Sequence, residues 1–159
     1  MPVRVGINGF GRIGRNIMRA ALGDKNIDFV AINDLTSAHT LAHLLKYDSV
    51  MGNLHAKVEA REDTIAVDGD EFKVLQHRDP AQLPWKELGV DVVFESTGLF
   101  TNRDAAAQHL AAGAKKVGIT APATRPDSTL LLCAHHEPSA PATPRLPPTT
   151  PSPTTPPPP

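Results

Sequence analysis

Residues 3–14 read VRVGINGFGRIG, and this stretch decides the fold of the chain. Its first half is a short apolar run typical of a buried strand, and a helical pattern begins near its end. Between them stand Gly9, Gly11 and Gly14 in G-x-G-x-x-G spacing, which gains weight when a strand precedes it and a helix follows. The helix should bury the apolar stripe formed by Ile13, Ile17, Ala20 and Ala21, and it should stop near Gly23.

The next strand, expected over residues 27–33, ends at the acidic residue Asp34. An acidic side chain at this point is typical of dinucleotide-binding domains, where it accepts hydrogen bonds from the adenosine ribose. Gly9 then allows a tight turn, Gly11 lets a pyrophosphate approach the backbone, and Gly14 lets the helix pack closely on the strand. The N–H groups at the helix start would hold the phosphates. The charge of Asp34 favours NAD over NADP, because it repels a 2′-phosphate.

The remaining pattern predicts an α/β fold. Ser37 should cap a helix that buries Leu41, Leu44 and Leu45, and Asp68-Gly69 predicts the turn of a small antiparallel excursion. Further elements are expected as a helical turn near 85–88, a strand over 90–95, a helix capped by Thr101 with Asp104 and ending at Gly113, a strand over 116–120, and the start of another strand over 128–133. We therefore predict a Rossmann-type, doubly wound, mostly parallel sheet over residues 1–133.

The chain closely resembles the glyceraldehyde-3-phosphate dehydrogenase family from about residue 3 to about residue 132. The motifs that carry the resemblance are VGINGFGRIGR (5–15), NDL (33–35), LKYDS (45–49), HRDP (77–80), PW (84–85), ESTG (95–98), FT (100–101), GAKKV (113–117) and APA (121–123). The resemblance implies an NAD-dependent oxidoreductase of glycolysis that converts an aldehyde into an acyl phosphate.

The resemblance also implies a set of cofactor-binding residues. Those matching Asn8, Phe10, Arg12 and Ile13 line the pyrophosphate and nicotinamide side in the family. Those matching Asp34 and Arg78 face the adenosine half, and Leu35 resembles the NAD-preferring members. The crevice is completed by Thr97, Gly98, Phe100 and Thr120. With Asn33 and the three glycines Gly9, Gly11 and Gly14, these residues form the expected NAD site.

The chemistry of the family depends on a cysteine in a Ser-Cys-Thr-Thr-Asn stretch and on a later histidine, and neither motif occurs in these 159 residues. Cys133 is the single cysteine, and its surroundings do not match that stretch, so we expect an inert thiol. The sequence thus predicts no catalytic residue, and NAD binding without turnover. The choice of substrate lies in the unmatched half, so a dehydrogenase of another sugar-phosphate aldehyde stays open. His39 and His43 have helical metal-binding spacing, but two ligands do not complete a site, and no metal is expected.

Composition divides the chain in two, because 11 of its 16 prolines lie between Pro138 and Pro159. We expect residues 134–159 to be a disordered, polyproline-like tail, and a shifted reading frame would explain its abrupt start. Alternatively the tail is the working part of an interaction protein, since Arg145, Pro148 and Pro151 fit the R-x-x-P-x-x-P spacing of SH3 ligands.

Overall charge and cysteine content set the remaining expectations. The net charge is -1, which gives no electrostatic reason to expect nucleic acid or an acidic membrane surface as partner. One cysteine and the lack of a signal or membrane pattern favour the cytoplasm. The family assembles as homotetramers, but much of that contact surface belongs to the unmatched half, so tetramer formation by this chain is doubtful.

Overall fold

The structure is a computed structural model that describes residues 1–129. Residues Met1–Pro126 form one compact unit, and Asp127–Pro159 form a second, of which only the first three residues are described. The elements are β1 (Val3–Asn8), α1 (Arg12–Ala21), β2 (Ile27–Asn33), α2 (Ala38–Lys46), β3 (Tyr47–Asp48), β4 (Gly52–Asn53), β5 (Val58–Ala60), β6 (Thr64–Val67), β7 (Asp70–Leu75), the 3-10 helix η1 (Pro80–Gln82), β8 (Val92–Glu95), α3 (Arg103–Ala111) and β9 (Lys116–Ile119).

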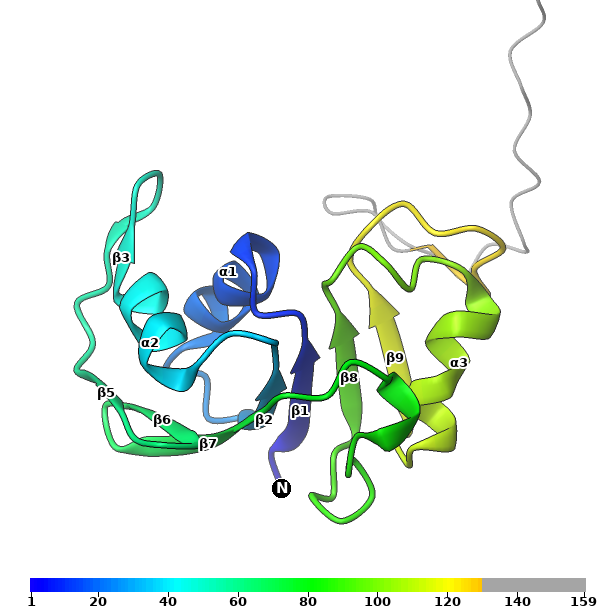
Figure 1. The fold of residues 1–159 in the computed structure, drawn as a ribbon, viewed down its shortest axis with the longest axis horizontal. Helices are drawn as coiled ribbons and strands as arrows, with labels where there is room; N and C mark the ends of the chain where they lie inside the picture. The colour runs from blue at the N-terminus through cyan, green and yellow to red at the C-terminus, as the bar shows by residue number, and fades with distance from the viewer. Residues whose placement is uncertain (130–159) are drawn as a thin grey trace, which may run out of the picture. The chain divides into compact units, whose positions relative to one another are not determined.

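Seven strands form one sheet in the order β5-β6-β7-β2-β1-β8-β9 (Figure 1). The five strands from β7 to β9 pair in parallel, and β5, β6 and β7 pair antiparallel. The predicted doubly wound α/β fold is confirmed. The predicted antiparallel segment consists of β5, β6 and β7, and it is part of the main sheet because β7 pairs with both β6 and β2. The chain reverses its winding between β1 and β8, and open α/β sheets bind ligands at the carboxyl ends of strands beside such a point.

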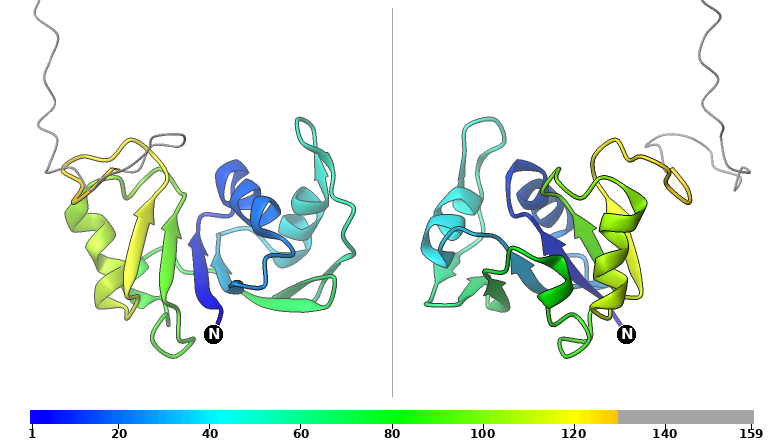
Figure 2. Two further views of the ribbon diagram at one scale, coloured as in Figure 1. Left: turned by 180° about the vertical axis from the view of Figure 1, so that it is seen from behind. Right: turned by 45° about the vertical axis from the view of Figure 1, so that its right-hand side comes forward.

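Both faces of the sheet are covered, and successive residues of β1 point alternately to one face and the other. Val5 and Ile7 point into a core shared with α1 and α2, whereas Gly6 and Asn8 point to the opposite face. There the Trp85 ring lies so close to Gly6 that a Cβ would come within 2.8 Å of it. Helix α3 lies on the same side, beside β8 and β9 (Figures 1 and 2).

The predicted apolar stripe of α1 is confirmed at Ile17, which is half-buried and packs against the core, and at the half-buried Ala21, but it is wrong at the other two positions. Ile13 is 48% exposed and Ala20 is also exposed, whereas Gly14 and Met18 are buried. The helix meets the sheet through Gly14, which contributes no apolar side chain and so escapes a search for hydrophobic periodicity. A similar error affects α2, where Leu41 and Leu45 are buried as predicted but Leu44 is exposed.

The predicted capping box at the start of α3 is also wrong. The cap is Asn102, whose Oδ1 accepts the N–H of Ala105 at 2.7 Å. Thr101 instead takes part in a loop contact, because its carbonyl accepts the N–H of Thr124 at 3.0 Å. The side-chain oxygen of asparagine caps a helix at least as well as a threonine hydroxyl, and the prediction overlooked Asn102.

Other local predictions agree with the structure. Ser37 caps α2, and Asp68-Gly69 turns between β6 and β7 with positive φ at both residues, as a type I′ turn requires. Gly23 and Gly113 follow α1 and α3 with positive φ. The expected turn near 85–88 is present, with the N–H of Leu88 donating to the carbonyl of Pro84, but η1 was not predicted.

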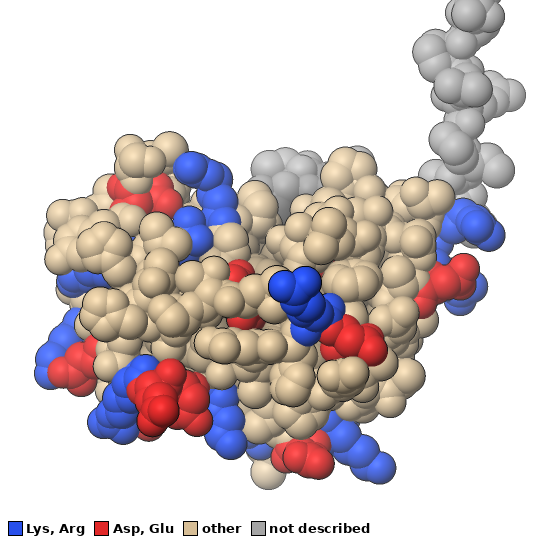
Figure 3. Space-filling view, viewed as in Figure 1, with Lys and Arg blue, Asp and Glu red and all other residues tan. Residues whose placement is uncertain are grey.

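Residues 128 and 129 belong to no strand, and the rest of the strand expected over 128–133 lies outside the described residues, as do Cys133 and the proline-rich segment. Within the described part of the chain, no helix is long and apolar enough to cross a membrane. On the face drawn in Figure 3, basic and acidic side chains are interspersed rather than gathered by sign.

Candidate functional site: a crevice at the carboxyl ends of the parallel strands

The three glycines between β1 and α1 have three different surroundings. Gly9 has φ +89°, and a Cβ there would come within 2.6 Å of the Thr97 backbone nitrogen. A Cβ on Gly14 would lie 2.3 Å from the Gly9 carbonyl oxygen, so this glycine permits the close packing predicted for it. At Gly11 a Cβ would meet nothing within 4 Å. The loop is therefore tightly packed on either side of Gly11 and open at Gly11 itself, where α1 begins with free N–H groups.

Asp34 connects the end of β2 to this loop. Its Oδ2 accepts the N–H of Phe10 at 2.9 Å, and its Oδ1 accepts the N–H of Thr36 at 3.0 Å. The carboxylate is half-buried, so it keeps an open side, and each of its oxygens has a further lone pair for a ligand hydroxyl. Asp34 thus holds the loop in shape and presents a negative charge at the edge of the crevice.

Asn8 and Asn33 are buried at the ends of β1 and β2 and bind each other. Asn33 Nδ2 donates to Asn8 Oδ1 at 2.7 Å, and it also donates to the carbonyl of His77 at 2.8 Å. The N–H of His77 returns a bond to Asn33 Oδ1 at 2.9 Å. Both side-chain amides are therefore engaged inside the protein, where they align the ends of β1 and β2 with the segment after β7.

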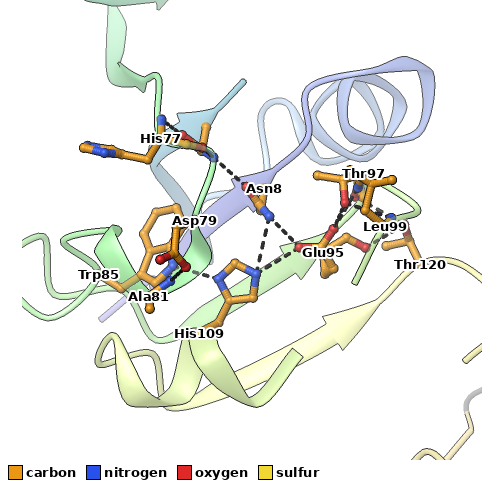
Figure 4. Close-up of polar contacts among 12 residues, drawn as sticks. Asn8, His77, Asp79, Ala81, Trp85, Glu95, Thr97, Leu99, His109 and Thr120 are labelled. Carbon is orange, nitrogen blue, oxygen red and sulfur yellow. Dashed lines mark hydrogen bonds and ion pairs between the residues drawn. The ribbon is translucent and has the colours of Figure 1, made fainter. Parts of the chain in front are cut away.

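Glu95 ends β8 and is 1% exposed, yet it is surrounded by hydrogen-bond donors (Figure 4). Asn8 Nδ2 and His109 Nε2 contact its Oε2, the latter at 2.9 Å, and the N–H and hydroxyl of Thr97 contact its Oε1. Burial by itself raises the pKa of Glu95, but the hydrogen bonds from His109, Thr97 and Asn8 outweigh burial and hold that pKa below its usual value. Glu95 is therefore a buried carboxylate in its ionised form.

His109 lies on α3 and is fully buried between Glu95 and Trp85. The indole Nε1–H of Trp85 donates to His109 Nδ1 at 3.1 Å. Because an indole N–H can only donate, Nδ1 must accept, and the ring proton resides on Nε2, which faces Glu95. His109 is thus a neutral imidazole held in one tautomer.

The turn after β8 lies against the glycine loop at Gly9, and we call the region bounded by this loop, Asp34 and the turn the cofactor crevice. The hydroxyl of Thr97 bonds to Glu95 and accepts the N–H of Leu99, and Gly98 has φ +74°. Thr120, directly after β9, donates its hydroxyl proton to the carbonyl of Glu95 at 3.1 Å, and its Oγ1 can then accept the hydroxyl proton of Ser96, whose Oγ lies 3.2 Å away. These contacts join the carboxyl ends of β8 and β9.

The residues expected to bind a cofactor therefore fall into three groups. The ends of β1, β2, β8 and β9 bring together Asn8, Gly9, Gly11, Gly14, Asn33, Asp34, Thr97, Gly98 and Thr120. Arg12, Ile13 and Arg78 are exposed, and Phe100 is half-buried. Phe10 is fully buried with its ring 6.3 Å from that of Phe72, so only its backbone faces the loop. The arrangement suits a ligand with phosphates at α1 and a hydroxylated sugar at Asp34.

Residues 3–103 match the family described as "Glyceraldehyde 3-phosphate dehydrogenase, NAD binding domain". The chain belongs to this family. It is 58% identical over 134 residues to glyceraldehyde-3-phosphate dehydrogenase 1 of Bacillus cereus, a match that covers 84% of this chain and 40% of the relative. It is 59% identical over 132 residues to the enzyme of Geobacillus stearothermophilus, covering 83% of this chain and 39% of the relative. The chain is also 59% identical over 131 residues to the Thermotoga maritima enzyme, a match that covers 81% of this chain and 39% of the relative.

Membership of the glyceraldehyde-3-phosphate dehydrogenase family identifies NAD as the cofactor of this domain. The residues present fit that cofactor, since the loop is open at Gly11 and a carboxylate stands at the end of β2. The chain spans about 40% of the length of the curated relatives it matches.

Sequence reasoning missed the part played by Glu95, His109 and Trp85. Glu95 lies within a quoted motif, and the available signal was a charged residue at the end of an apolar strand, which must find partners when buried. His109 gave no such signal, because one histidine in an alanine-rich helix is ordinarily solvent-exposed.

The two histidines with metal-binding spacing, His39 and His43, lie on α2. Both are exposed, and the His43 ring packs against Tyr47 with centroids 4.8 Å apart. The residues that the structure describes contain no group of three or more metal-ligating side chains. The expectation that Cys133 is inert concerns a residue outside the described part of the chain.

Proposed function

We propose that this chain binds NAD across the carboxyl ends of its parallel strands. The pyrophosphate would lie against the N-terminus of α1 at Gly11, with Arg12 and Ile13 beside it. The adenosine ribose would bind Asp34, with Arg78 near the adenine, and the nicotinamide half would lie toward Thr97 and Thr120. Asn8, Asn33 and Phe10 would support the site from within, through the bonds that hold the loop and the strand ends.

The observation that carries this proposal is the position of the Asp34 carboxylate. Hydrogen bonds from Phe10 and Thr36 place it beside the glycine loop and leave lone pairs for two ribose hydroxyls. A 2′-phosphate would bring a second negative charge to the same point, so NADP should bind much more weakly than NAD.

Titration calorimetry of the full chain with NAD and with NADP tests the proposal. Asp34→Ala should weaken NAD binding at least tenfold, or about 1.4 kcal/mol. It should also reduce the difference in affinity between NAD and NADP. Asp63→Ala, the same change at an exposed aspartate on the β5–β6 turn, is the matched control and should leave both affinities unchanged. Equal NAD affinity of Asp34→Ala and Asp63→Ala would refute the assignment.

We further propose that these 159 residues bind the cofactor without turnover. A thiolate nucleophile and a histidine base are needed to oxidise an aldehyde to an acyl phosphate in this family, and the Ser-Cys-Thr-Thr-Asn stretch does not occur in the sequence. Glyceraldehyde 3-phosphate, NAD and inorganic phosphate should give no NADH absorbance above background. The full-length Geobacillus stearothermophilus enzyme serves as the positive control, and sustained NADH formation by this chain alone would overturn the proposal.

A further inference from the structure

The crevice is underlain by a buried chain of hydrogen bonds in which three groups can only donate (Figure 4). They are the backbone N–H of His77, the indole N–H of Trp85 and the backbone N–H of Thr97. Starting from these three groups, the orientations of the Asn33 and Asn8 amides and the tautomer of His109 are determined.

The first branch crosses three strand ends. Because the N–H of His77 donates to Asn33 Oδ1, the amide nitrogen of Asn33 must face Asn8 Oδ1, as it does at 2.7 Å. The amide nitrogen of Asn8 then faces Glu95 Oε2 and donates to it. A reversed amide at either asparagine would place two donors or two acceptors opposite each other, so both orientations are fixed.

The other two branches reach the same carboxylate. Trp85 fixes the tautomer of His109, whose Nε2–H donates to Glu95 Oε2 at 2.9 Å, and the N–H of Thr97 donates to Oε1 at 2.8 Å. With His109 Nε2 committed as a donor, its 3.4 Å contact with Asn8 Nδ2 joins two donors and is not a hydrogen bond. All three branches therefore end on Glu95, and the network is consistent only when Glu95 is an acceptor on both oxygens.

We propose that Glu95 is the positioning residue of the cofactor crevice, and that it makes the position of the Thr97 turn depend on His109 and Trp85 on the α3 side of the sheet. This inference rests on the proposed NAD site and deepens it. The network joins the ends of β1, β2 and β8 with the segment after β7, and these four strands are neighbours in the sheet. Glu95 would not touch NAD itself; it would act through Thr97 and Asn8.

The first test needs neither a variant nor NAD. Two-dimensional ¹H–¹⁵N NMR of the imidazole nitrogens, on the unmodified full chain at neutral pH, reports which ring nitrogen of His109 carries the proton. We expect a protonated Nε2 and an unprotonated Nδ1, with slow solvent exchange of the Nε2 proton. A proton on Nδ1, or a doubly protonated ring, would overturn the network.

The second test measures the consequence for the cofactor. In Glu95→Gln the side-chain NH₂ must face either Asn8 and His109 or the N–H of Thr97, so two donors oppose each other in both orientations. Calorimetry should show NAD binding weakened about tenfold or more, together with a shifted Thr97 amide resonance. Glu62→Gln, the same change at an exposed glutamate, should leave both unchanged. A folded Glu95→Gln protein that binds NAD within twofold of the unmodified chain would overturn the inference.

Trp85→Phe keeps the inference testable if Glu95→Gln fails to fold. It removes the donor to His109 Nδ1 and substitutes no crevice residue, so the imidazole is held by its Nε2–H bond to Glu95 alone. We expect faster solvent exchange of the His109 Nε2 proton and NAD binding weakened severalfold, whereas unchanged exchange with unchanged affinity would contradict the inference. If the unmodified chain binds no NAD, the proposed function fails, and the tautomer measurement still judges the network by itself.

Discussion

Adding one methyl group at Gly14 and at Gly11 should have opposite consequences, although the two residues are only three positions apart. The Cβ of alanine at residue 14 would lie 2.3 Å from the Gly9 carbonyl oxygen and 3.0 Å from Ile7 Cγ2. Since ordinary contact begins near 3.4 Å, α1 must move by about 1 Å relative to β1 or the loop must deform. Overpacking of this kind costs about 1–3 kcal/mol, and the rigid backbone neighbour places Gly14→Ala at the upper end.

Gly11→Ala should leave stability intact. Its φ of -71° is normal for alanine, and a Cβ there would meet nothing within 4 Å. Reduced entropy of the unfolded chain favours alanine by about 0.4–1 kcal/mol, and this gain offsets a loss of similar size that arises because Gly11 is the N-cap of α1, where alanine is less favourable than glycine. The methyl group would nevertheless occupy the space into which we place the pyrophosphate, so NAD binding should weaken at least tenfold, or about 1.4 kcal/mol.

Urea unfolding followed by the fluorescence of Trp85, the single tryptophan and a fully buried one, measures both stabilities. Calorimetry with NAD measures both affinities. We predict a lower unfolding midpoint for Gly14→Ala, and lost NAD affinity with a normal unfolding midpoint for Gly11→Ala. Equal midpoints for the two variants, or full NAD affinity in Gly11→Ala, would refute this prediction.

Two further predictions concern α3 and Glu95. Asn102→Ala should destabilise the protein by about 1 kcal/mol through loss of the α3 cap, whereas Thr101→Ala should change the urea midpoint little. A larger loss of stability in Thr101→Ala than in Asn102→Ala would show that Thr101 is the cap after all. The pKa of Glu95 is lowered in the folded state, so its ionisation stabilises the protein above the unfolded-state pKa of about 4.3, and this contribution is lost as the pH falls through the lower folded value. Urea unfolding between pH 6 and pH 3 should therefore show a steeper acid loss in the unmodified protein than in Glu95→Gln, and parallel curves would contradict the assignment.

The fold was predictable because its decisive signals are local. Strands β1 and β2 are apolar runs ended by polar residues, and the Asp68-Gly69 turn needs positive φ at two positions that these residues tolerate. The errors arose where tertiary packing chose between local options. Gly14 and Met18 are the buried positions of α1, and Asn102 rather than Thr101 caps α3, while the Thr101 carbonyl accepts the N–H of Thr124.

The site was predictable only in part, for a related reason. The glycine loop and Asp34 are close in sequence, and their spacing is typical of dinucleotide-binding domains. The bonds of Glu95 to Asn8 and His109 connect residues 87 and 14 positions apart, and the pattern of neither residue pair signals a contact. A buried ionised carboxylate is visible only once strand order places its donors around it.

The most direct measurement is a titration of the ¹⁵N-labelled full chain with NAD, followed through its backbone amide resonances. Our account predicts that the largest shifts occur at Gly11, Arg12 and Ile13, with further shifts at Asp34 and Thr97, while the strands β5 and β6 remain unchanged. Saturating NAD that leaves the amides at the start of α1 unshifted, or that shifts chiefly β5 and β6, would contradict it.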